Sequence, residues 1–221
     1  MTDSGAPVYR TVILDVDSTL CGVEGIDWLA ELRDVEIAKR IADETALAMR
    51  GELTVDSIYA SRLETVAPTR EEVATLTDVY MSALAPGAED AIKRWMEAGI
   101  VVALVSGGFR QAIAPMAEKI GIPVERVFAM DLMFDSAGDY AGYDLESPLS
   151  KMLGKREVVS GLDMPRPIIT VGDGSTDLTT RQVVDAFVAF TGFAKREEIA
   201  AQADFVAASF AEVDDIVFGR A

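Results

Sequence analysis

Four nearly continuous apolar runs limit the possible folds of this chain more than any other feature of its sequence. They lie at residues 11–16, 100–105, 167–172 and 186–190, and turn-forming residues bound each of them. A strand with one face in water alternates apolar and polar residues, whereas a strand covered on both faces is apolar along its length. The runs therefore predict a parallel sheet with helices on both faces, which is a doubly wound α/β fold.

Helical patterns lie between these runs, and their ends carry the usual boundary residues. Pro86 precedes the first pattern, and Gly99 and Gly121 close the first two. The helices predicted in this part of the chain cover residues 87–98, 110–120, 151–162 and 195–202. Residues 127–144 instead alternate and carry the turn sequence Ser-Ala-Gly-Asp at 136–139, so they predict a small β-hairpin insertion.

The segment 21–85 interrupts this alternation, because it separates the first two apolar runs and carries helical patterns along nearly all of its length. The helices predicted within it cover residues 31–50, 55–66 and 70–83. The last of these begins with the capping-box residues Thr69 and Glu72. We therefore expect a helical cap domain at 21–85, inserted into an α/β core domain made of residues 1–20 and 86–221.

Charge and residue usage exclude several classes of function. The formal net charge of −17 disfavours binding to nucleic acid or to an anionic membrane surface. The longest apolar run, 100–105, is too short to span a bilayer, and residues 1–10 carry no apolar leader, so we expect a cytoplasmic monomer or homodimer. The chain has no histidine, which excludes Ser-His-Asp and Cys-His nucleophile systems. Carboxylates, hydroxyls, lysine and hard metal ions are left to carry any chemistry.

Polar residues stand at the ends of three of the four apolar runs, where ligands bind in an open α/β sheet. Asp15 and Asp17 lie at the end of the first run, residues 106–109 follow the second, and residues 171–177 end the third. Lys155 lies early in the helix before that third run. Each signal alone has an ordinary explanation, because Asp and Ser cap helices, Gly-Asp-Gly forms turns and most lysines are solvated. Their convergence on one edge of one sheet is what indicates a site.

Phosphoryl transfer is the chemistry that such a set of groups favours. A carboxylate can attack phosphorus and form an aspartyl phosphate, which divides one slow step into two faster ones. Mg²⁺ held by carboxylates offsets the repulsion between the two anions, while a lysine and backbone N–H groups take the charge on the phosphoryl oxygens. Asp15 and Asp17 are two residues apart in an extended segment, so both can face one phosphate, one to attack and one to protonate the leaving oxygen.

Five short motifs occur in a fixed order along the chain: DVDSTL at 15–20, EGID at 24–27, SGGF at 106–109, GK at 154–155 and GDGSTD at 172–177. With these motifs the chain, from about residue 11 to 218, resembles the haloacid dehalogenase superfamily of aspartyl-phosphate phosphatases. The resemblance implies that Asp15 is the phosphorylated nucleophile and that Asp17 acts first as the general acid and then as the general base.

The resemblance also implies a metal site and a phosphate site. It implies that Mg²⁺ is held by Asp15, the backbone carbonyl of Asp17 and Asp173, and that Asp177 orients this metal site. The residues that it implies around the phosphate and the substrate are Ser106, Gly107, Lys155 and Thr176. Lys151 lies one helical turn before Lys155 and is an alternative for the lysine.

Substrate recognition falls to the predicted cap. Arg62 lies on the apolar stripe of the helix at 55–66, where it either lays its stem along the core or needs a partner for its charge. A substrate carboxylate can pair with Arg62, and Glu24 can take an ammonium group. A phosphate, a carboxylate and an ammonium on one small molecule describe O-phosphoserine. Glu24, Met49 and Arg62 also match positions in superfamily members that act on O-phosphoserine. Val55 departs from those members, because they often have an aromatic residue there.

Three other functions fit parts of the pattern. A receiver-type signalling module also has a phospho-acceptor Asp, a Lys and Mg²⁺, but it is a shorter chain without a cap and its acceptor lies on a middle strand. A catalytically idle relative is disfavoured, because the carboxylates and the lysine are intact. The main alternative is a phosphotransferase that passes the phosphoryl group to another alcohol, or a phosphatase of phosphothreonine or another small amino-alcohol phosphate.

Overall fold

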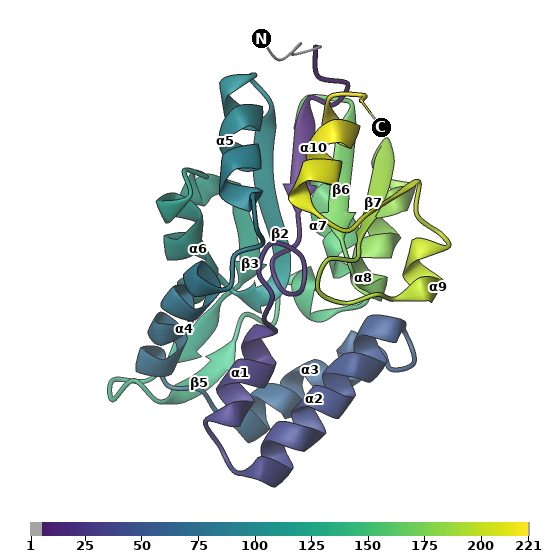
Figure 1. Ribbon diagram of the computed structural model, residues 1–221. Helices are drawn as coiled ribbons and strands as arrows, with labels where there is room; N and C mark the ends of the chain where they lie inside the picture. The colour runs from purple at the N-terminus through teal and green to yellow at the C-terminus, as the bar shows by residue number, and fades with distance from the viewer. Residues whose placement is uncertain (1–5, 221) are drawn as a thin grey trace.

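The computed structural model describes residues 6–220, and its centre is one sheet of six strands (Figure 1). The strand order is β3-β2-β1-β6-β7-β8, and every neighbouring pair is parallel. The strands are β1 (Thr11–Leu14), β2 (Val101–Phe109), β3 (Val127–Met130), β6 (Ile168–Gly172), β7 (Ala186–Phe190) and β8 (Phe205–Ala207). The predicted doubly wound α/β fold is confirmed. The sequence does not predict β8, because three residues are too few to give a pattern.

β1 lies in the middle of the sheet, which its four buried side chains require. Leu14 pairs with Leu104 on one side and with Val171 on the other. The chain continues from β1 to β2 on one side and later reaches β6 on the other, so the strand order reverses beside β1. A reversal of this kind leaves a crevice at the carboxyl ends of the strands, where open α/β sheets bind ligands.

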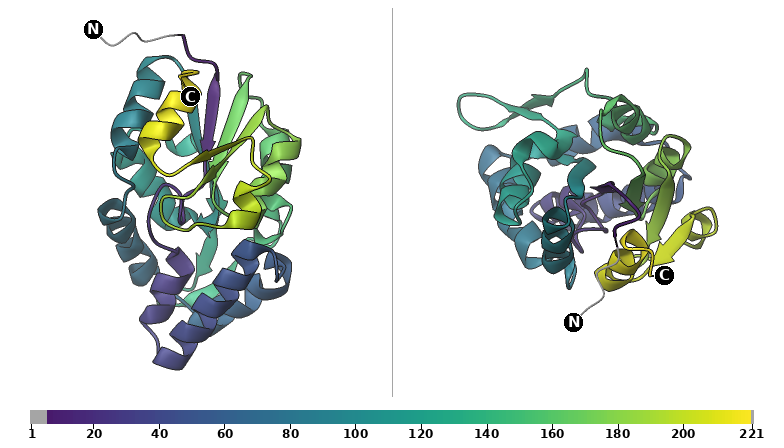
Figure 2. Two further views of the ribbon diagram at one scale, coloured as in Figure 1. Left: turned by 45° about the vertical axis from the view of Figure 1, so that its right-hand side comes forward. Right: turned by 90° about the horizontal axis from the view of Figure 1, so that it is seen from above.

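Helices cover both faces of the sheet (Figure 2). α5 (Ala88–Glu97) and α10 (Phe210–Val217) pack together, with the rings of Trp95 and Phe210 stacked at a centroid distance of 6.2 Å. The other helices of this part are α6 (Arg110–Lys119), α7 (Gly154–Gly161), α8 (Ser175–Leu178) and α9 (Glu197–Ala200), with 3₁₀ turns at Val124–Arg126, Pro148–Ser150 and Thr179–Gln182. Within residues 6–220, no helix is long and apolar enough to cross a membrane. The cytoplasmic location and the oligomeric state stay predictions.

The inserted segment holds one helix more than the sequence predicts. Its helices are α1 (Gly25–Glu31), α2 (Val35–Arg50), α3 (Val55–Val66) and α4 (Arg70–Ser82). The predicted helix at 31–50 is wrong at its start, because Asp34 caps α2 by accepting a hydrogen bond from the Ile37 N–H at 2.9 Å. The predicted capping box of α4 is confirmed, since Thr69 and Glu72 each accept a hydrogen bond from the other's N–H.

α1, α2 and α3 lie beyond the carboxyl edge of the sheet, at the bottom of Figure 1, whereas α4 packs beside α6. Hydrogen bonds join α2 and α3 to that edge: the Tyr59 hydroxyl donates to the Gly107 carbonyl at 2.9 Å, Ser175 Oγ donates to the Ala48 carbonyl at 2.8 Å, and the Met152 N–H donates to Asp56 at 2.6 Å. These bonds fix the position of the inserted helices over the end of β1. The division into a cap at 21–85 and a core stays a prediction.

The predicted hairpin at 127–144 is wrong in its first part. Residues 127–130 form β3, which pairs in parallel with β2, because the buried Val127 and Met130 extend the apolar side of the main sheet. The hairpin that remains is an antiparallel pair of β4 (Leu132–Phe134) and β5 (Tyr140–Tyr143). Gly138 lies in the turn between them with a φ of 92°, which glycine adopts without strain.

Candidate active site

A buried cluster of charges lies at the carboxyl end of β1. Lys155, in the first turn of α7, sits between two carboxylates, with its Nζ 2.7 Å from Asp15 Oδ1 and 2.7 Å from Asp177 Oδ1. Asp15 follows β1 directly, and its N–H donates to the Val171 carbonyl at 2.9 Å, so the pairing of β1 with β6 fixes its backbone. All three charged side chains are buried. The sheet therefore brings together groups that lie far apart in the sequence.

Burial and neighbouring charges set the protonation of this cluster. Burial raises the pKa of Asp15 well above its ordinary value, the Asp177 carboxylate raises it further, and Lys155 opposes both. Burial lowers the pKa of Lys155, but its two carboxylate neighbours outweigh burial and raise that pKa overall. Lys155 is therefore a fixed positive charge, and it favours the ionised form that a nucleophilic carboxylate needs.

Asp17 is held by donors from three parts of the chain. Its Oδ1 accepts hydrogen bonds from the Gly25 N–H at 2.6 Å and from the Tyr80 hydroxyl at 2.8 Å, and its Oδ2 accepts one from Ser106 Oγ at 3.3 Å. The next residue, Ser18, has a φ of 55°, so the backbone turns sharply after Asp17. Burial raises the pKa of Asp17, which suits a carboxyl group that has to carry a proton.

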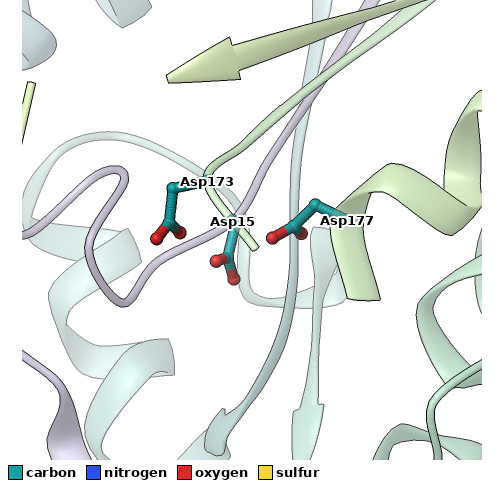
Figure 3. A group of neighbouring side chains, drawn as sticks. All are labelled: Asp15, Asp173 and Asp177. Carbon is teal, nitrogen blue, oxygen red and sulfur yellow. The ribbon is translucent and has the colours of Figure 1, made fainter. Parts of the chain in front are cut away.

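Asp15, Asp173 and Asp177 form an acidic group in which one ligand oxygen of each lies within 4.8 Å of the others (Figure 3). Thr19 Oγ1 donates to Asp173 Oδ1 at 3.1 Å, and the buried Asp173 Oδ2 forms an ion pair with Arg196. Carboxylate oxygens are the ligands that hard divalent cations prefer. Two predicted metal ligands, Asp15 and Asp173, thus lie beside Asp177, and the donor set fits a divalent metal. The side chain of Asp17 lies outside this group.

Arg196 is a member of this site that the sequence does not reveal. It stands in the loop before α9 and forms an ion pair with Asp173 Oδ2. Its Nη2 atom lies 3.9 Å from Glu24 Oε1. Burial lowers the pKa of this arginine. No motif surrounds Arg196, and its two partners lie in other parts of the chain, so no local pattern could have marked it.

Residues 106–109 form the end of β2 rather than the start of a helix. The register with β3 shifts across this stretch, which marks an irregular strand end. The Gly108 N–H donates to Ser106 Oγ at 2.9 Å. A Cβ on Gly108 would lie 2.8 Å from Asp17 Oδ2, so glycine is what leaves room for that carboxyl group. The Ser-Gly-Gly sequence therefore shapes the space around Asp17.

A cavity of about 760 Å³, counting the part open to solvent, lies between the inserted helices and the sheet edge. The predicted site residues that line it are Asp15, Asp17, Glu24, Met49, Arg62, Ser106, Gly107, Lys155 and Thr176. Asp173 is not part of this lining. Lys151 also lines the cavity and is exposed, whereas Lys155 is fixed in two buried ion pairs. The choice of Lys155 over Lys151 as the phosphate-binding residue stays a prediction.

Arg62 is buried in the wall of this cavity, and within residues 6–220 nothing neutralises its charge at hydrogen-bond distance. The Arg62 Nη1 donates to the uncharged Thr45 hydroxyl at 3.0 Å. The Thr45 hydroxyl in turn donates to Asp27 Oδ1 at 2.6 Å. The Arg62 Nε is buried and has no hydrogen-bond partner among the described residues. Burial lowers the pKa of Arg62, and the nearby Asp27 carboxylate opposes this. A buried guanidinium in this state can pair with a carboxylate from outside the chain.

Glu24 lines the same cavity, at the end of the loop that joins β1 to α1, residues 15–24, which we call the catalytic loop. Ser18 Oγ donates to its Oε1 at 2.6 Å. Burial and the nearby Asp17 carboxylate raise the pKa of Glu24 to about 7. Glu24 therefore changes charge near neutral pH, and a cation bound beside it would favour its ionised form.

Comparison with known proteins places this geometry in a family. Residues 12–180, which are most of the chain, match the haloacid dehalogenase-like hydrolase family. The chain belongs to the haloacid dehalogenase-like hydrolases. This hydrolase is 39% identical over 206 residues to the chloroplastic phosphoserine phosphatase of Arabidopsis thaliana, covering 91% of this chain and 69% of that protein. It is 36% identical over 205 residues to the phosphoserine phosphatase of Homo sapiens, covering 91% of this chain and 90% of that protein.

Solved structures agree with the family assignment. A structure described as a phospho-aspartyl intermediate analogue of phosphoserine phosphatase has a TM-score of 0.78 and 25% sequence identity, and it covers 94% of this chain and 98% of its own. The fold is therefore shared over nearly the whole hydrolase.

Two tyrosines of this hydrolase reach the site without having been predicted there. Tyr59 lines the cavity and binds the Gly107 carbonyl, and Tyr80 binds Asp17. Tyr59 has a sequence signal, because residues 55, 59 and 62 lie on one face of a helix and the aromatic ring missing at Val55 appears one turn later. Tyr80 has none, because its place depends on how α4 packs.

Proposed function

We propose that this hydrolase converts O-phosphoserine and water to serine and phosphate through an aspartyl phosphate on Asp15. The observation that carries the proposal is a single cavity that is lined both by the buried carboxylate of Asp15 and by the buried, unneutralised guanidinium of Arg62. A phosphoester that also bears a carboxylate can present its phosphorus to Asp15 and its carboxylate to Arg62. The relatives support the same choice, since they are named as phosphoserine phosphatases.

The proposal includes Mg²⁺ as the metal. Asp15, Asp173 and the backbone carbonyl of Asp17 would hold it, and Asp177 would orient the site. The close spacing of the three aspartates and their burial support this assignment. When bound, Mg²⁺ supplies positive charge against the phosphoryl oxygens and against the carboxylates around them.

In the first half-reaction, a carboxylate oxygen of Asp15 attacks phosphorus while the bond between phosphorus and the serine oxygen breaks. Asp17 gives its proton to the departing serine oxygen, so no free alkoxide has to form. Lys155, already fixed between two carboxylates, faces the charge that spreads over the phosphoryl oxygens without having to move. Ser106 and Gly107 line the same part of the cavity.

In the second half-reaction, Asp17 is ionised and removes a proton from a water molecule as the water oxygen attacks phosphorus. The bond between phosphorus and Asp15 breaks, and the Asp15 carboxylate and inorganic phosphate are released. The raised pKa of Asp17 supports this role, because a carboxyl group exchanges protons efficiently when its pKa lies closer to the working pH.

Recognition of the amino acid is assigned to the inserted helices. Arg62 binds the substrate carboxylate, Glu24 binds the ammonium group, and Met49 and Val55 contribute apolar atoms to the lining of the same cavity. Thr176, from the start of α8, lines the cavity near the catalytic groups. The substrate thus spans the space from the sheet edge to α3.

A panel of phosphoesters tests the substrate assignment. We compare kcat/KM for O-phosphoserine, O-phosphothreonine, O-phosphoethanolamine and a hexose phosphate. Phosphoethanolamine keeps the ammonium group and lacks the carboxylate, so its kcat/KM should be lower by about 100-fold or more, the order of the loss when a buried arginine has no ionic partner. Equal values for phosphoserine and phosphoethanolamine would refute the role of Arg62.

An acceptor assay separates hydrolysis from phosphotransfer. Serine release and phosphate release are measured together in the presence of an added alcohol such as ethanolamine. Hydrolysis predicts equal amounts of serine and phosphate. Serine release well above phosphate release would mean that the phosphoryl group passes to the alcohol.

A further inference from the structure

Tyr80 is a fully buried residue whose hydroxyl points into the catalytic loop. It is 0% exposed, and its hydroxyl donates to Asp17 Oδ1 at 2.8 Å. The Gly25 N–H donates to the same oxygen at 2.6 Å. Gly25 opens α1 and Tyr80 lies in the last turn of α4, so the two donors come from the two ends of the inserted helices.

The packing around Asp17 leaves its carboxyl group little freedom to turn. A Cβ on Gly25 would overlap the Tyr80 hydroxyl and would lie 3.3 Å from Asp17 Oδ1. On the other side, a Cβ on Gly108 would lie 2.8 Å from Asp17 Oδ2. The two glycines allow the backbone to close on both oxygens, and the hydroxyl fills the remaining space beside Oδ1.

The two oxygens of Asp17 therefore have different surroundings. Oδ1 accepts two short hydrogen bonds, from Gly25 and Tyr80, whereas Oδ2 accepts one longer bond, at 3.3 Å, from Ser106 in the cavity wall. An oxygen that already accepts two hydrogen bonds is a poor site for an exchanging proton, because the proton would displace one of them. The proton that moves during the reaction is left to Oδ2.

We infer that Tyr80 is a positioning residue for the proton transfer: with the Gly25 N–H it holds Asp17 Oδ1, so that Oδ2 exchanges the proton. As the bond from phosphorus to the serine oxygen breaks, the proton on Oδ2 passes to that oxygen. In the second step, Oδ2 takes a proton from the water that attacks phosphorus. The inference rests on the proposed function, and it adds a residue of α4 to the groups that set its rate.

Leaving-group dependence separates this role from a purely structural one. Tyr80→Phe removes the hydroxyl alone, and rapid-quench experiments measure the first half-reaction with phosphoserine and with p-nitrophenyl phosphate. The serine oxygen needs a proton to leave, whereas p-nitrophenolate leaves readily without one. Serine release should slow about 10- to 100-fold, the order for losing one hydrogen bond to a charged group, while the p-nitrophenol burst should slow by less than about threefold. Equal slowing of both substrates, or none, would overturn the inference.

A double-mutant comparison gives a second readout. If Tyr80 acts through Asp17, Tyr80→Phe should cause no further loss in an enzyme that already carries Asp17→Asn. Losses that multiply would show that the two residues act independently, which contradicts the inference. Tyr9→Phe is the matched control, because Tyr9 is also buried but lies before β1, at the opposite end of the strand. Tyr9→Phe should leave both rates unchanged.

Stability and the proposed function are checked in the same series. Should Tyr80→Phe fail to fold, Tyr80→Gln and Tyr80→Met provide a pair of similar size with and without a donor. The Gln variant should then release serine faster than the Met variant, and equal rates would count against the inference. If Asp17→Asn itself leaves serine release normal, the proposed role of Asp17 fails. If Asp17→Asn is slow and Tyr80→Phe is not, only the role of Tyr80 fails.

Discussion

The two walls of the cavity treat charge in opposite ways. At the sheet edge, Lys155 lies 2.7 Å from both Asp15 and Asp177, so the charges there are paired before a ligand arrives. On the cavity wall formed by α3, which we call the α3 wall, Arg62 is just as deeply buried. Among the described residues, its Nε has no hydrogen-bond partner and its Nη1 donates only to the Thr45 hydroxyl. At the sheet edge the buried cation is paired within the chain, whereas on the α3 wall the buried cation is left for a ligand to pair with.

This difference indicates a division of labour. Charges that are already fixed in place stabilise a transition state without reorganising, so the sheet edge should act on any phosphoester. A buried charge without a partner attracts an opposite charge, so we propose that the α3 wall selects for a substrate that carries a carboxylate. Substitutions at the sheet edge should therefore affect all substrates alike, whereas substitutions on α3 should affect phosphoserine alone.

The largest effect is expected at the proposed nucleophile. Asp15→Asn keeps the shape of the side chain and removes the attacking charge, so kcat should fall by about 10⁴-fold or more with every phosphoester. Steady-state assays with phosphoserine and p-nitrophenyl phosphate measure the loss, and circular dichroism checks that the fold is intact. A folded variant with kcat within tenfold of the unaltered enzyme would rule out covalent catalysis by this residue.

The second effect should show the paired character of the sheet edge. Lys155→Met leaves Asp15 and Asp177 buried without their shared cation, so the free energy of unfolding should fall by about 3–5 kcal/mol. Removal of a preorganised positive group should also lower kcat by about 10²–10³-fold. Urea unfolding and steady-state kinetics measure the two effects. A loss of activity confined to one substrate would break the comparison between the walls.

The third effect concerns the α3 wall, where removal of the buried charge should not destabilise the protein. Arg62→Met removes a buried, unneutralised charge, so we expect the free energy of unfolding to stay the same or to rise. The KM for phosphoserine should increase by about 100-fold, while the KM for p-nitrophenyl phosphate should change by less than about threefold, because only phosphoserine has a carboxylate to lose. Arg40→Met, at an exposed arginine of α2, is the matched control. Equal changes in KM for both substrates would refute the selective role of this wall.

The smallest effect concerns the ion pair between Arg33 and Glu72, which joins the inserted helices to one another. Arg33, between α1 and α2, pairs with Glu72 of α4 at 2.7 Å, and hydrogen bonds from Arg33 lower the pKa of Glu72 from 4.5 to about 2. Because the folded-state pKa is below the unfolded value, the stabilisation is present above pH 4.5 and is lost as the pH falls toward 2. The loss should be about 0.5–1 kcal/mol, since the pair is partly exposed.

Urea unfolding at several pH values across this window measures the contribution of the pair. Glu72→Gln should remove that part of the pH dependence and should leave the kinetic constants at neutral pH unchanged. An identical pH dependence in Glu72→Gln and in the unaltered enzyme would show that the pair adds nothing to the free energy of unfolding.

The fold could be predicted where burial leaves a continuous pattern. β7 has its predicted ends, 186–190, because both of its faces are covered. The sequence predicts residues 127–130 as part of the hairpin, because an alternating pattern does not tell a strand that pairs with its neighbour from one that pairs with a distant strand. The break between α1 and α2 depends on the cap at Asp34, which lies inside a nearly uninterrupted helical pattern.

The site could be predicted where its residues follow strand ends. Asp15, Asp17 and Asp173 stand at or just after such ends, and the topology alone brings them to one edge. Arg196 and Tyr80 have no such position, since each reaches the site through packing between a loop or helix and the catalytic loop. Local sequence patterns carry no information on such packing, so only the structure shows that these two residues belong to the site.

The central claim is that Asp15 becomes phosphorylated in each catalytic cycle, and trapping that species tests it most directly. The enzyme is mixed with phosphoserine, quenched in acid during turnover, digested and analysed by peptide mass spectrometry. The account predicts a phosphoryl group on Asp15, and none on the corresponding peptide of Asp15→Asn. A phosphoryl group on another residue, or continued turnover with no phosphorylated peptide, would contradict it.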